Sequence, residues 1–267
     1  MRNNSLKKVL VIGASGSVGK HVIDVALQQG LEVRAFVRSK SSAHQIPEAI
    51  ELVIGDFAHE ADLKSAVKGV DAIVFTHGTY GSLKTAEAVD YGVVRNVLGA
   101  LEGQRQRIAL MTTIGATDRK GAHDWKRRAE WLVRAGGHAY TIVRPAWFDC
   151  NAPDEHQLLM LQGDKSLAGS PKDGVIARRQ LAEVLVRSLY SKEAIGKTFE
   201  LHAIKGSAQS NFDPLFFKLD SDRPGSIHGI HDIQNMPLED EPQNIRMDIQ
   251  NAQSAASIVQ ALEFHHD

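Results

Sequence analysis

The sequence lacks several features that would tie it to a special environment. It has one cysteine among 267 residues, Cys150, so an intrachain disulfide is excluded. No apolar run is long enough to span a bilayer, and the first residues show no secretory cleavage pattern. Basic residues number 31 and acidic residues 32, so no excess charge favours nucleic acid or an anionic membrane as a partner. We therefore expect a cytoplasmic protein.

Strand-like and helical segments alternate through the first part of the chain. The segments that predict strands are 8–12, 32–37, 50–54, 72–75, 107–111 and 139–143. The segments that predict helices are 19–29, 60–68, 83–101 and 123–135. Such alternation is typical of parallel strands joined by right-handed crossovers. We therefore predict an α/β fold, with a Rossmann-type, doubly wound parallel sheet and helices on both faces.

The pattern loosens past Pro145. A helix is predicted over 177–190 and a late strand over 197–201, and a last helix over 251–263. We predict a Rossmann-like domain over 1–204, in which segments near 146–177 lie on the substrate side. A small, irregular C-terminal part follows over 205–267. The terminal pair His265-His266 is too short to suggest a metal site, and we expect none.

Three glycines follow the first predicted strand at a spacing of three, and a helical segment comes next. The first allows a sharp bend, the second lets the backbone approach a pyrophosphate, and the third lets helix and strand pack closely. Free N–H groups at the start of the helix then face the anion. The sequence thus predicts a dinucleotide-binding loop. Its cofactor-binding residues are Gly13, Ser15, Gly16, Ser17, Val18 and Gly19.

The end of the second predicted strand bears on which dinucleotide binds. An NAD site usually places a carboxylate there, on the adenosine ribose. Here Arg38 follows the strand, and no acidic residue lies between Val33 and Pro47. A guanidinium can bind a 2′-phosphate, whereas a carboxylate would repel it. NADP(H) is therefore the preferred cofactor, and NAD(H) remains possible if Arg38 is only a solvated loop cation.

Two further strand ends supply candidate cofactor contacts. Asp56 can accept a hydrogen bond from the adenine amino group with Phe57 beside the ring, or it can serve as a turn residue before the next helix. After the fourth strand, the small and hydroxylated segment 76–81 suits the pyrophosphate and ribose. From it we assign Thr76, His77 and Gly78 to the cofactor. Tyr80 is a candidate for the substrate pocket.

With these residues in view, the chain resembles the short-chain dehydrogenase/reductase superfamily. It looks most like the atypical branch of small NAD(P)-binding proteins with NmrA-like and NADPH-quinone-reductase-like members. The resemblance covers about residues 7–202. The matching segments are 13–19, 33–38, 55–56, 110–115, 126–130, 140–145, 175–178 and 181–183.

The resemblance implies a catalytic set of tyrosine, lysine and a hydroxyl residue. A phenol exchanges protons poorly at neutral pH unless a nearby cation stabilises its phenolate. Thr113, or Thr112 beside it, matches the hydroxyl position, and Lys126 matches the lysine, which would also hold the nicotinamide ribose. Ala122 stands where the tyrosine is expected. A Tyr-x-x-x-Lys spacing does occur at Tyr80 and Lys84, but after the wrong strand.

The sixth predicted strand leads into Pro145, which we assign to the cofactor, and then into Trp147 and Phe148. These two aromatic residues are candidates for an apolar substrate pocket, Trp147 also for cofactor contact, or they are core residues. The leading hypothesis is an NADP(H)-dependent oxidoreductase acting on a small carbonyl, quinone or flavin-like acceptor. The alternatives are a non-catalytic NADP(H) sensor that binds a regulatory protein, and a nucleotide-sugar epimerase or dehydratase. A homodimer is also possible.

Overall fold

A single large sheet forms the centre of the computed structural model, which describes residues 6–79 and 81–264, with the side-chain surroundings given up to residue 258. Its ten strands are β1 (Lys8–Ile12), β2 (Glu32–Val37), β3 (Glu51–Ile54), β4 (Ala72–Phe75), β5 (Arg107–Met111), β6 (Ala139–Pro145), β7 (Trp147–Phe148), β8 (Gln157–Leu161), β9 (Val175–Ile176) and β10 (Lys197–Ile204).

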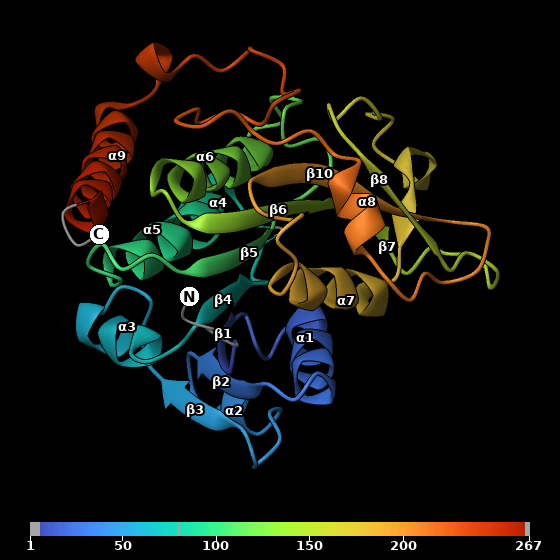
Figure 1. Cartoon of the computed structure of the whole chain (residues 1–267), viewed down its shortest axis with the longest axis horizontal. Helices are drawn as coiled ribbons and strands as arrows, with labels where there is room; N and C mark the ends of the chain where they lie inside the picture. The colour runs from blue at the N-terminus through green and yellow to red at the C-terminus, as the bar shows by residue number, and fades with distance from the viewer. Residues whose placement is uncertain (1–5, 80, 265–267) are drawn as a thin grey trace.

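The strand order is β3-β2-β1-β4-β5-β6-β10-β9-β7, and β8 pairs with β10. Strands β1 to β6 and β10 run parallel, whereas β8 and β9 run antiparallel to β10. The chain moves outward from β1 to β3 and then returns to β4 on the other side of β1. This reversal is the point at which doubly wound sheets bind their ligands. The predicted Rossmann-type fold is confirmed (Figure 1).

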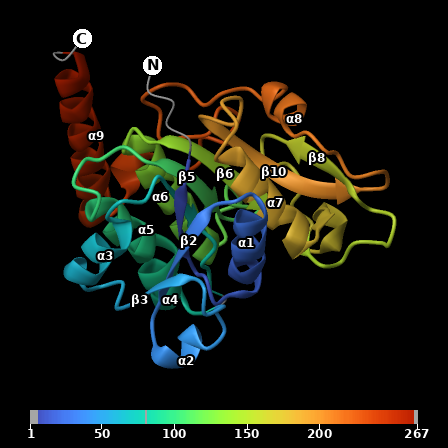
Figure 2. The same ribbon diagram turned by 60° about the horizontal axis from the view of Figure 1, so that its bottom comes forward.

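Helices cover both faces of the sheet. They are α1 (Ser17–Gln28), α2 (Lys40–Ala43), α3 (Glu60–Val67), α4 (Leu83–Ala86), α5 (Gly92–Gly99), α6 (Ala122–Ala135), α7 (Arg178–Ser188), α8 (Asp213–Phe217) and α9 (Gln243–Phe264). Helices α1 and α7 pack on one face of the sheet, and α3, α5 and α6 pack on the other. Figure 2 shows this separation from a second direction.

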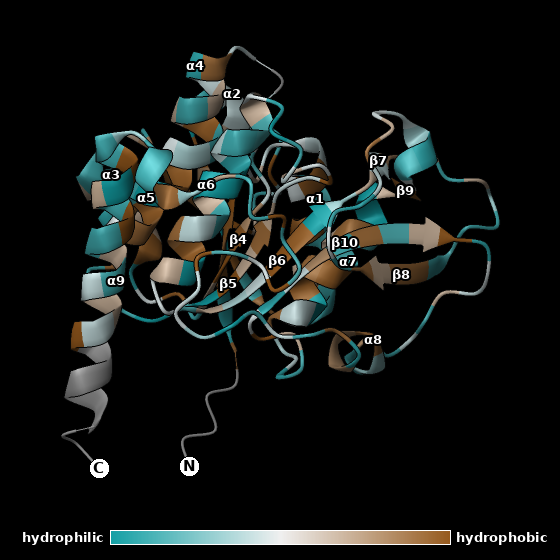
Figure 3. Cartoon of the chain, turned by 90° about the horizontal axis from the view of Figure 1, so that it is seen from above, coloured by the Kyte–Doolittle hydropathy of each residue, from teal (hydrophilic) through white to brown (hydrophobic). Residues whose placement is uncertain are grey.

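Successive residues of β1 explain why two cores form. Val9 and Val11 belong to the core under α1 and α7, whereas Leu10 and Ile12 belong to the core under α3, α5 and α6. Side chains of a strand alternate between faces, so a strand that is apolar at every position must be covered on both sides. Figure 3 shows the hydrophobic strands at the centre and hydrophilic residues on the helices around them.

The segment predicted as one helix over 83–101 is interrupted by a π-helical turn, η1 (Glu87–Tyr91), between α4 and α5. The expected continuous α-helix is therefore wrong at this point. The turn contains Asp90 and Tyr91, both buried, and the Tyr91 hydroxyl donates to Asp248 Oδ2 at 2.8 Å. A π turn inserts one residue into the helical repeat and so rotates the following side chains by about 100° about the helix axis. Such turns are frequent at functional sites.

The C-terminal part is irregular around α8 until α9 begins at Gln243, earlier than the predicted Asn251. Helix α9 packs on the outer face of α6 through a third apolar cluster that includes Trp131, Ile245 and Ile249. Residues 222–235 also contribute charged and amide groups to a buried network beneath α6. Among the described helices, none is long and apolar enough to cross a membrane. His265 and His266 lie outside the described residues.

Candidate functional site

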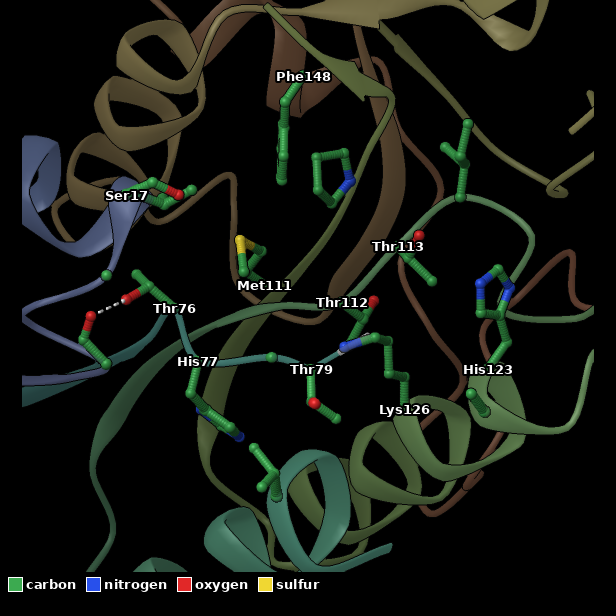
Figure 4. A pocket seen from close by; sticks show the side chains of 18 of the residues that line it. Ser17, Thr76, His77, Thr79, Met111, Thr112, Thr113, His123, Lys126 and Phe148 are labelled. Carbon is green, nitrogen blue, oxygen red and sulfur yellow. Dashed lines mark hydrogen bonds between the residues drawn. The ribbon is translucent and has the colours of Figure 1, made fainter. Parts of the chain in front are cut away.

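A cavity of about 830 Å³ opens at the carboxyl ends of the parallel strands. The loops after β1 to β6, the segment after β8, residues of α4, η1, α5 and α6, and the first residue of α7 line it. Of the site residues predicted from the sequence, these line the cavity: Gly13, Ser15, Gly16, Ser17, Val18, Arg38, Phe57, Thr76, His77, Gly78, Thr112, Thr113, Lys126, Pro145, Trp147 and Phe148. Gly19 and Asp56 lie outside the lining, and Tyr80 lies outside the described residues. Figure 4 shows part of this cavity.

Two glycines of the turn after β1, Gly13 and Gly19, have the geometry that was expected of them. Gly13 has a φ of +86°, and a Cβ there would lie 2.7 Å from the backbone nitrogen of His77. A Cβ on Gly19 would lie 2.2 Å from the Gly13 carbonyl oxygen. Gly19 therefore permits close packing of α1 on the loop and does not contact the cavity. Any larger residue at Gly13 or Gly19 would clash with the backbone of this turn.

The N-terminus of α1 faces the cavity without a capping side chain. Its N-cap residue is Gly16, which offers no side-chain hydrogen bond to the first N–H groups. Uncapped N–H groups and the positive end of the helix dipole together favour an anion. This arrangement fits the diphosphate of a dinucleotide.

Arg178 is a cavity residue that the sequence analysis matched to the family but did not assign to the site. Its Nε donates to Ser17 Oγ at 3.0 Å, so the guanidinium lies beside the N-terminus of α1. It also stacks on the Phe148 ring, 4.7 Å from the centroid, and pairs with Asp149. The sequence signal was an arginine at the first position of a helix; its closeness to Ser17 becomes visible only because α7 packs beside α1.

The other end of the cavity has an exposed cation and an aromatic pair. Arg38 is exposed in the lining. Phe57 also lines the cavity, and its ring centroid lies 4.6 Å from that of Phe36. Asp56 lies outside the lining, and its Oδ1 accepts the N–H of Ala58 at 2.9 Å, which is a turn contact before α3. Its contact with adenine stays a prediction.

Two neighbouring threonines in the loop after β5 differ in burial and in hydrogen bonding. The Thr112 hydroxyl donates to Glu130 Oε1 at 2.7 Å in a buried contact. Thr113 is half-buried, and within the described residues no hydrogen bond engages its hydroxyl. Figure 4 shows the Thr113 side chain at the cavity wall. Thr113 is therefore the hydroxyl that is free to contact a ligand.

Lys126 enters the same cavity from α6 and is paired with Asp90. Its Nζ lies 2.7 Å from Asp90 Oδ1, which also accepts the N–H of Thr79 at 3.2 Å. Burial raises the pKa of the Asp90 carboxyl, whereas the neighbouring ammonium opposes that rise. The sequence analysis missed Asp90 because the π turn that positions it was not predicted. Ala122, in the position expected for tyrosine, also lines the cavity.

Two residues after β4 have mainly structural surroundings. Thr76 Oγ1 donates to the carbonyl of Ile12 at 3.0 Å, which ties the two strand ends together. Burial, with a smaller contribution from Lys126, lowers the pKa of His77 to about 3. The His77 imidazole is therefore neutral near pH 7 and cannot act there as an acid.

Trp147 and Phe148 form the short strand β7 and line the cavity, and Phe148 also packs against the core under α1 and α7. Trp147 is 41% exposed. Within the described part of the chain, no cluster of three or more His, Cys, Asp or Glu side chains is arranged to hold a metal ion. The cavity thus combines an uncapped helix N-terminus, two arginines, a threonine hydroxyl and a lysine, next to an aromatic wall.

Comparison with known proteins agrees with this geometry. A family model described as NAD(P)H-binding matches residues 13–192. Sanguinarine reductase of Eschscholzia californica is 27% identical over 259 residues, covering 78% of this chain and 94% of that protein. The oxidoreductase ylbE of Lactococcus lactis has a TM-score of 0.66 at 18% identity, covering 81% of this chain and 100% of that chain. A short-chain dehydrogenase/reductase of Veillonella parvula, solved with NADP, has a TM-score of 0.58 at 14% identity, covering 78% and 100%.

The two solved structures support the fold, and the family model covers most of the chain. Its matched region begins at Gly13 and extends through the α7 helix that carries Arg178. It thus contains every residue that lines the cavity. The chain belongs to the NAD(P)H-binding family that this model describes, and its fold is the Rossmann fold of the solved structures.

Proposed function

We propose that this protein is an NADPH-dependent reductase that delivers hydride to a small carbonyl, quinone or flavin-like acceptor. The observation that carries the proposal is that two polar groups line the same cavity. They are the Thr113 hydroxyl, which no hydrogen bond within the described residues engages, and the Lys126 ammonium, which Asp90 holds in place. That cavity also contains the N-terminus of α1. Its volume of about 830 Å³ lies within the range of small-molecule and cofactor sites.

The residues around the cavity fit an NADP(H) molecule along its length. Arg38 would bind the 2′-phosphate, and Phe57 would contact the adenine. The uncapped N–H groups of α1, with Ser17 and Arg178 beside them, would bind the diphosphate. When bound, the reduced cofactor supplies hydride chemistry that side chains cannot supply.

The chain's own residues would position the acceptor and exclude water. The Thr113 hydroxyl would donate a hydrogen bond to the acceptor oxygen. The Lys126 ammonium, held by Asp90, would bind the ribose hydroxyls next to the nicotinamide. Trp147 and Phe148 would cover an apolar acceptor. Positioning and desolvation by such groups contribute strongly to catalysis.

A non-catalytic NADP(H) sensor is the second candidate, and Ala122 is the observation that favours it. With alanine in the tyrosine position, the usual proton donor of the superfamily is absent. Described residues beyond Arg178 do not line the cavity. The C-terminal part would then offer a surface to a regulatory protein or to a second copy of the chain, rather than a lid over the acceptor.

The test is cofactor oxidation with a panel of acceptors. The purified protein would be mixed with NADPH and a set of quinones, flavins and aldehydes, and the absorbance of the reduced nicotinamide would be followed. We expect catalytic oxidation with at least one acceptor class, which would also begin to identify the substrate. Tight NADPH binding without oxidation by any acceptor would overturn the reductase proposal in favour of the sensor.

A further inference from the structure

His123 lies in the cavity next to the place where the family tyrosine is missing. It follows Ala122 at the start of α6, and both residues line the cavity together with Thr113 and Lys126. Figure 4 shows the His123 ring between α6 and the loop after β5, with one ring nitrogen turned toward that loop and the other toward the cavity. The sequence analysis gave this histidine no role.

The orientation of the ring is fixed by a hydrogen bond to the backbone. Nδ1 of His123 lies 2.9 Å from the carbonyl oxygen of Gly115. A carbonyl oxygen only accepts hydrogen bonds, so Nδ1 carries a proton. Any second proton on the ring is therefore on Nε2, which is the nitrogen that faces the cavity.

The peptide unit of Gly115, which accepts the hydrogen bond from His123, is held in place by further buried hydrogen bonds. The buried carboxylate of Asp164 accepts the N–H of Gly115 at 2.6 Å, and the N–H and hydroxyl of Thr117 at 2.8 and 2.9 Å. Asn235, from the C-terminal part, donates to the Thr117 carbonyl at 2.9 Å. The loop is thus held at Gly115 and at Thr117, and the histidine ring has a rigid support. A catalytic group needs such support to keep its reactive atom in place.

We propose that His123 is the proton donor of this site and replaces the tyrosine that the chain lacks. The proposal rests on the reductase function proposed above. As a carbonyl acceptor is reduced, its carbon gains a hydride from the reduced nicotinamide, and its oxygen gains the proton from Nε2 of His123. The imidazolium becomes a neutral imidazole that keeps its Nδ1 proton on Gly115, and solvent then restores the Nε2 proton.

Charged groups of several elements lie around this part of the cavity. Lys126 on α6 and Lys120 in the preceding loop line the same cavity as His123. Asp90 on η1 interacts electrostatically with His123, and Asp164 lies behind Gly115. Histidine is the side chain best suited to gain and lose a proton near neutral pH. The missing phenol therefore has a chemically competent substitute within the same cavity.

The test uses 4-nitrophenol as a probe of the proton donor in the NADP⁺ complex. Its absorbance reports ionisation, and its phenolate imitates the oxyanion formed when an acceptor is reduced. His123→Asn is the informative variant, because the asparagine amide can still donate to Gly115 but has no titratable proton. His156→Asn removes an exposed histidine outside the cavity and serves as the matched control.

We expect the apparent pKa of bound 4-nitrophenol to be lower in the wild type than in His123→Asn by about one unit, the scale of one charge-assisted hydrogen bond. His156→Asn should match the wild type. Steady-state assays should show a loss in kcat of about tenfold or more for His123→Asn, with NADPH affinity unchanged. If the asparagine variant loses cofactor binding, His123→Gln replaces it, and loss of binding in both would make the role purely structural and overturn the proposal.

The outcomes separate this proposal from the reductase function. Turnover by the wild type, with the same nitrophenol pKa in wild type and His123→Asn, would overturn the role of His123 alone. A wild type that gives no nitrophenol signal would overturn it as well. A nitrophenol difference without turnover on any acceptor would instead overturn the reductase function, and with it the donor role.

Discussion

Two arginines face opposite ends of the cavity, and their positions assign them different parts of one cofactor. Arg38 follows β2 at the adenosine end, whereas Arg178 contacts Ser17 at the N-terminus of α1. The 2′-phosphate occurs only in NADP(H), whereas the diphosphate occurs in both dinucleotides. Substitutions at the two positions should therefore change the affinities for NADPH and NADH in different ways.

Arg38→Glu should weaken NADPH binding by about tenfold or more, since it replaces a charge-assisted hydrogen bond by repulsion. NADH binding should change little. Fluorescence titration of the variant with both nucleotides measures this selectivity. Arg38→Lys is the matched control and should keep part of the preference. Equal NADPH affinity in Arg38→Glu and wild type would show that Arg38 does not bind the 2′-phosphate.

Arg178→Gln should weaken NADPH and NADH by the same factor, of about tenfold, because both contain the diphosphate. The same titration measures it, and binding of both nucleotides should depend less on salt in the variant. Arg179→Gln, at the neighbouring position outside the cavity lining, is the control. A loss confined to one nucleotide would contradict a diphosphate contact.

At the scale of elements, the carboxyl ends of the strands are held together by a few buried polar contacts. Asp164 lies in the segment after β8 and holds the loop after β5 through three hydrogen bonds. An amide at this position would turn an N–H group toward donors that need an acceptor. A buried donor without a partner costs stability.

Asp164→Asn should therefore lower the free energy of unfolding by about 2 kcal/mol, or the Tm by about 5 °C. Thermal unfolding followed by circular dichroism would measure the change. Asp154→Asn changes an exposed aspartate in the same region and should leave Tm nearly unaltered. An equal Tm in Asp164→Asn and wild type would mean that the loop does not depend on this carboxylate.

The elements near the glycine turn follow from local sequence, and so do the longer elements α7, β10 and α9 beyond Pro145, whereas the shortest elements there do not. Strands β1, β2, β4 and β5 have the predicted bounds, because continuous apolar runs and turn glycines mark them directly. The short strands β7 and β9 contain two residues each and exist only through pairing with distant partners. No periodicity can appear in two residues.

The candidate site also contains residues that local sequence predicts and residues that it does not. Residues in the loops after parallel strands were predictable, since all carboxyl ends meet at one edge of a sheet. Asp90, His123 and Arg178 were not predicted as site residues. Each is placed by tertiary packing: the π turn puts Asp90 beside Lys126, the contact of α7 with α1 puts Arg178 in the cavity lining, and a hydrogen bond to Gly115 orients His123. Such contacts leave no local pattern in the sequence.

At the scale of the whole molecule, a buried charge network joins the sheet to the C-terminal part. The guanidiniums of Arg127, Arg134 and Arg144 face the carboxylates of Glu130, Asp222 and Asp232, as the distances and mutual electrostatic effects indicate. Arg144 lies 2.6 Å from Glu130 and 2.8 Å from Asp232. Since Glu130 also accepts from Thr112 in the cavity wall, the C-terminal part supports the site from behind.

Glu200 is a further carboxyl in this network, and burial raises its pKa to about 7. In the folded state the Glu200 carboxyl therefore keeps its proton at pH values where the same carboxyl in the unfolded chain, with an ordinary pKa of 4.5, has lost it. Between these two values the folded state binds more protons than the unfolded state. Its stability consequently falls as the pH rises through this window.

Glu200→Gln should remove that loss, since the amide stays neutral. Relative to the wild type, the variant should gain about 1–2 kcal/mol, or about 4 °C in Tm, between about pH 5 and about pH 8. Thermal unfolding at a series of pH values measures the difference. Tm curves that stay parallel across the range would show that Glu200 is ionised in the folded protein.

The cavity above β1 and β4 is proposed to bind a reduced nicotinamide dinucleotide, with NADPH preferred. The most direct measurement is a titration of the purified protein with NADPH and with NADH, followed by nicotinamide fluorescence. We expect saturable binding, at least about tenfold tighter for NADPH than for NADH. No saturable binding of either nucleotide would contradict it.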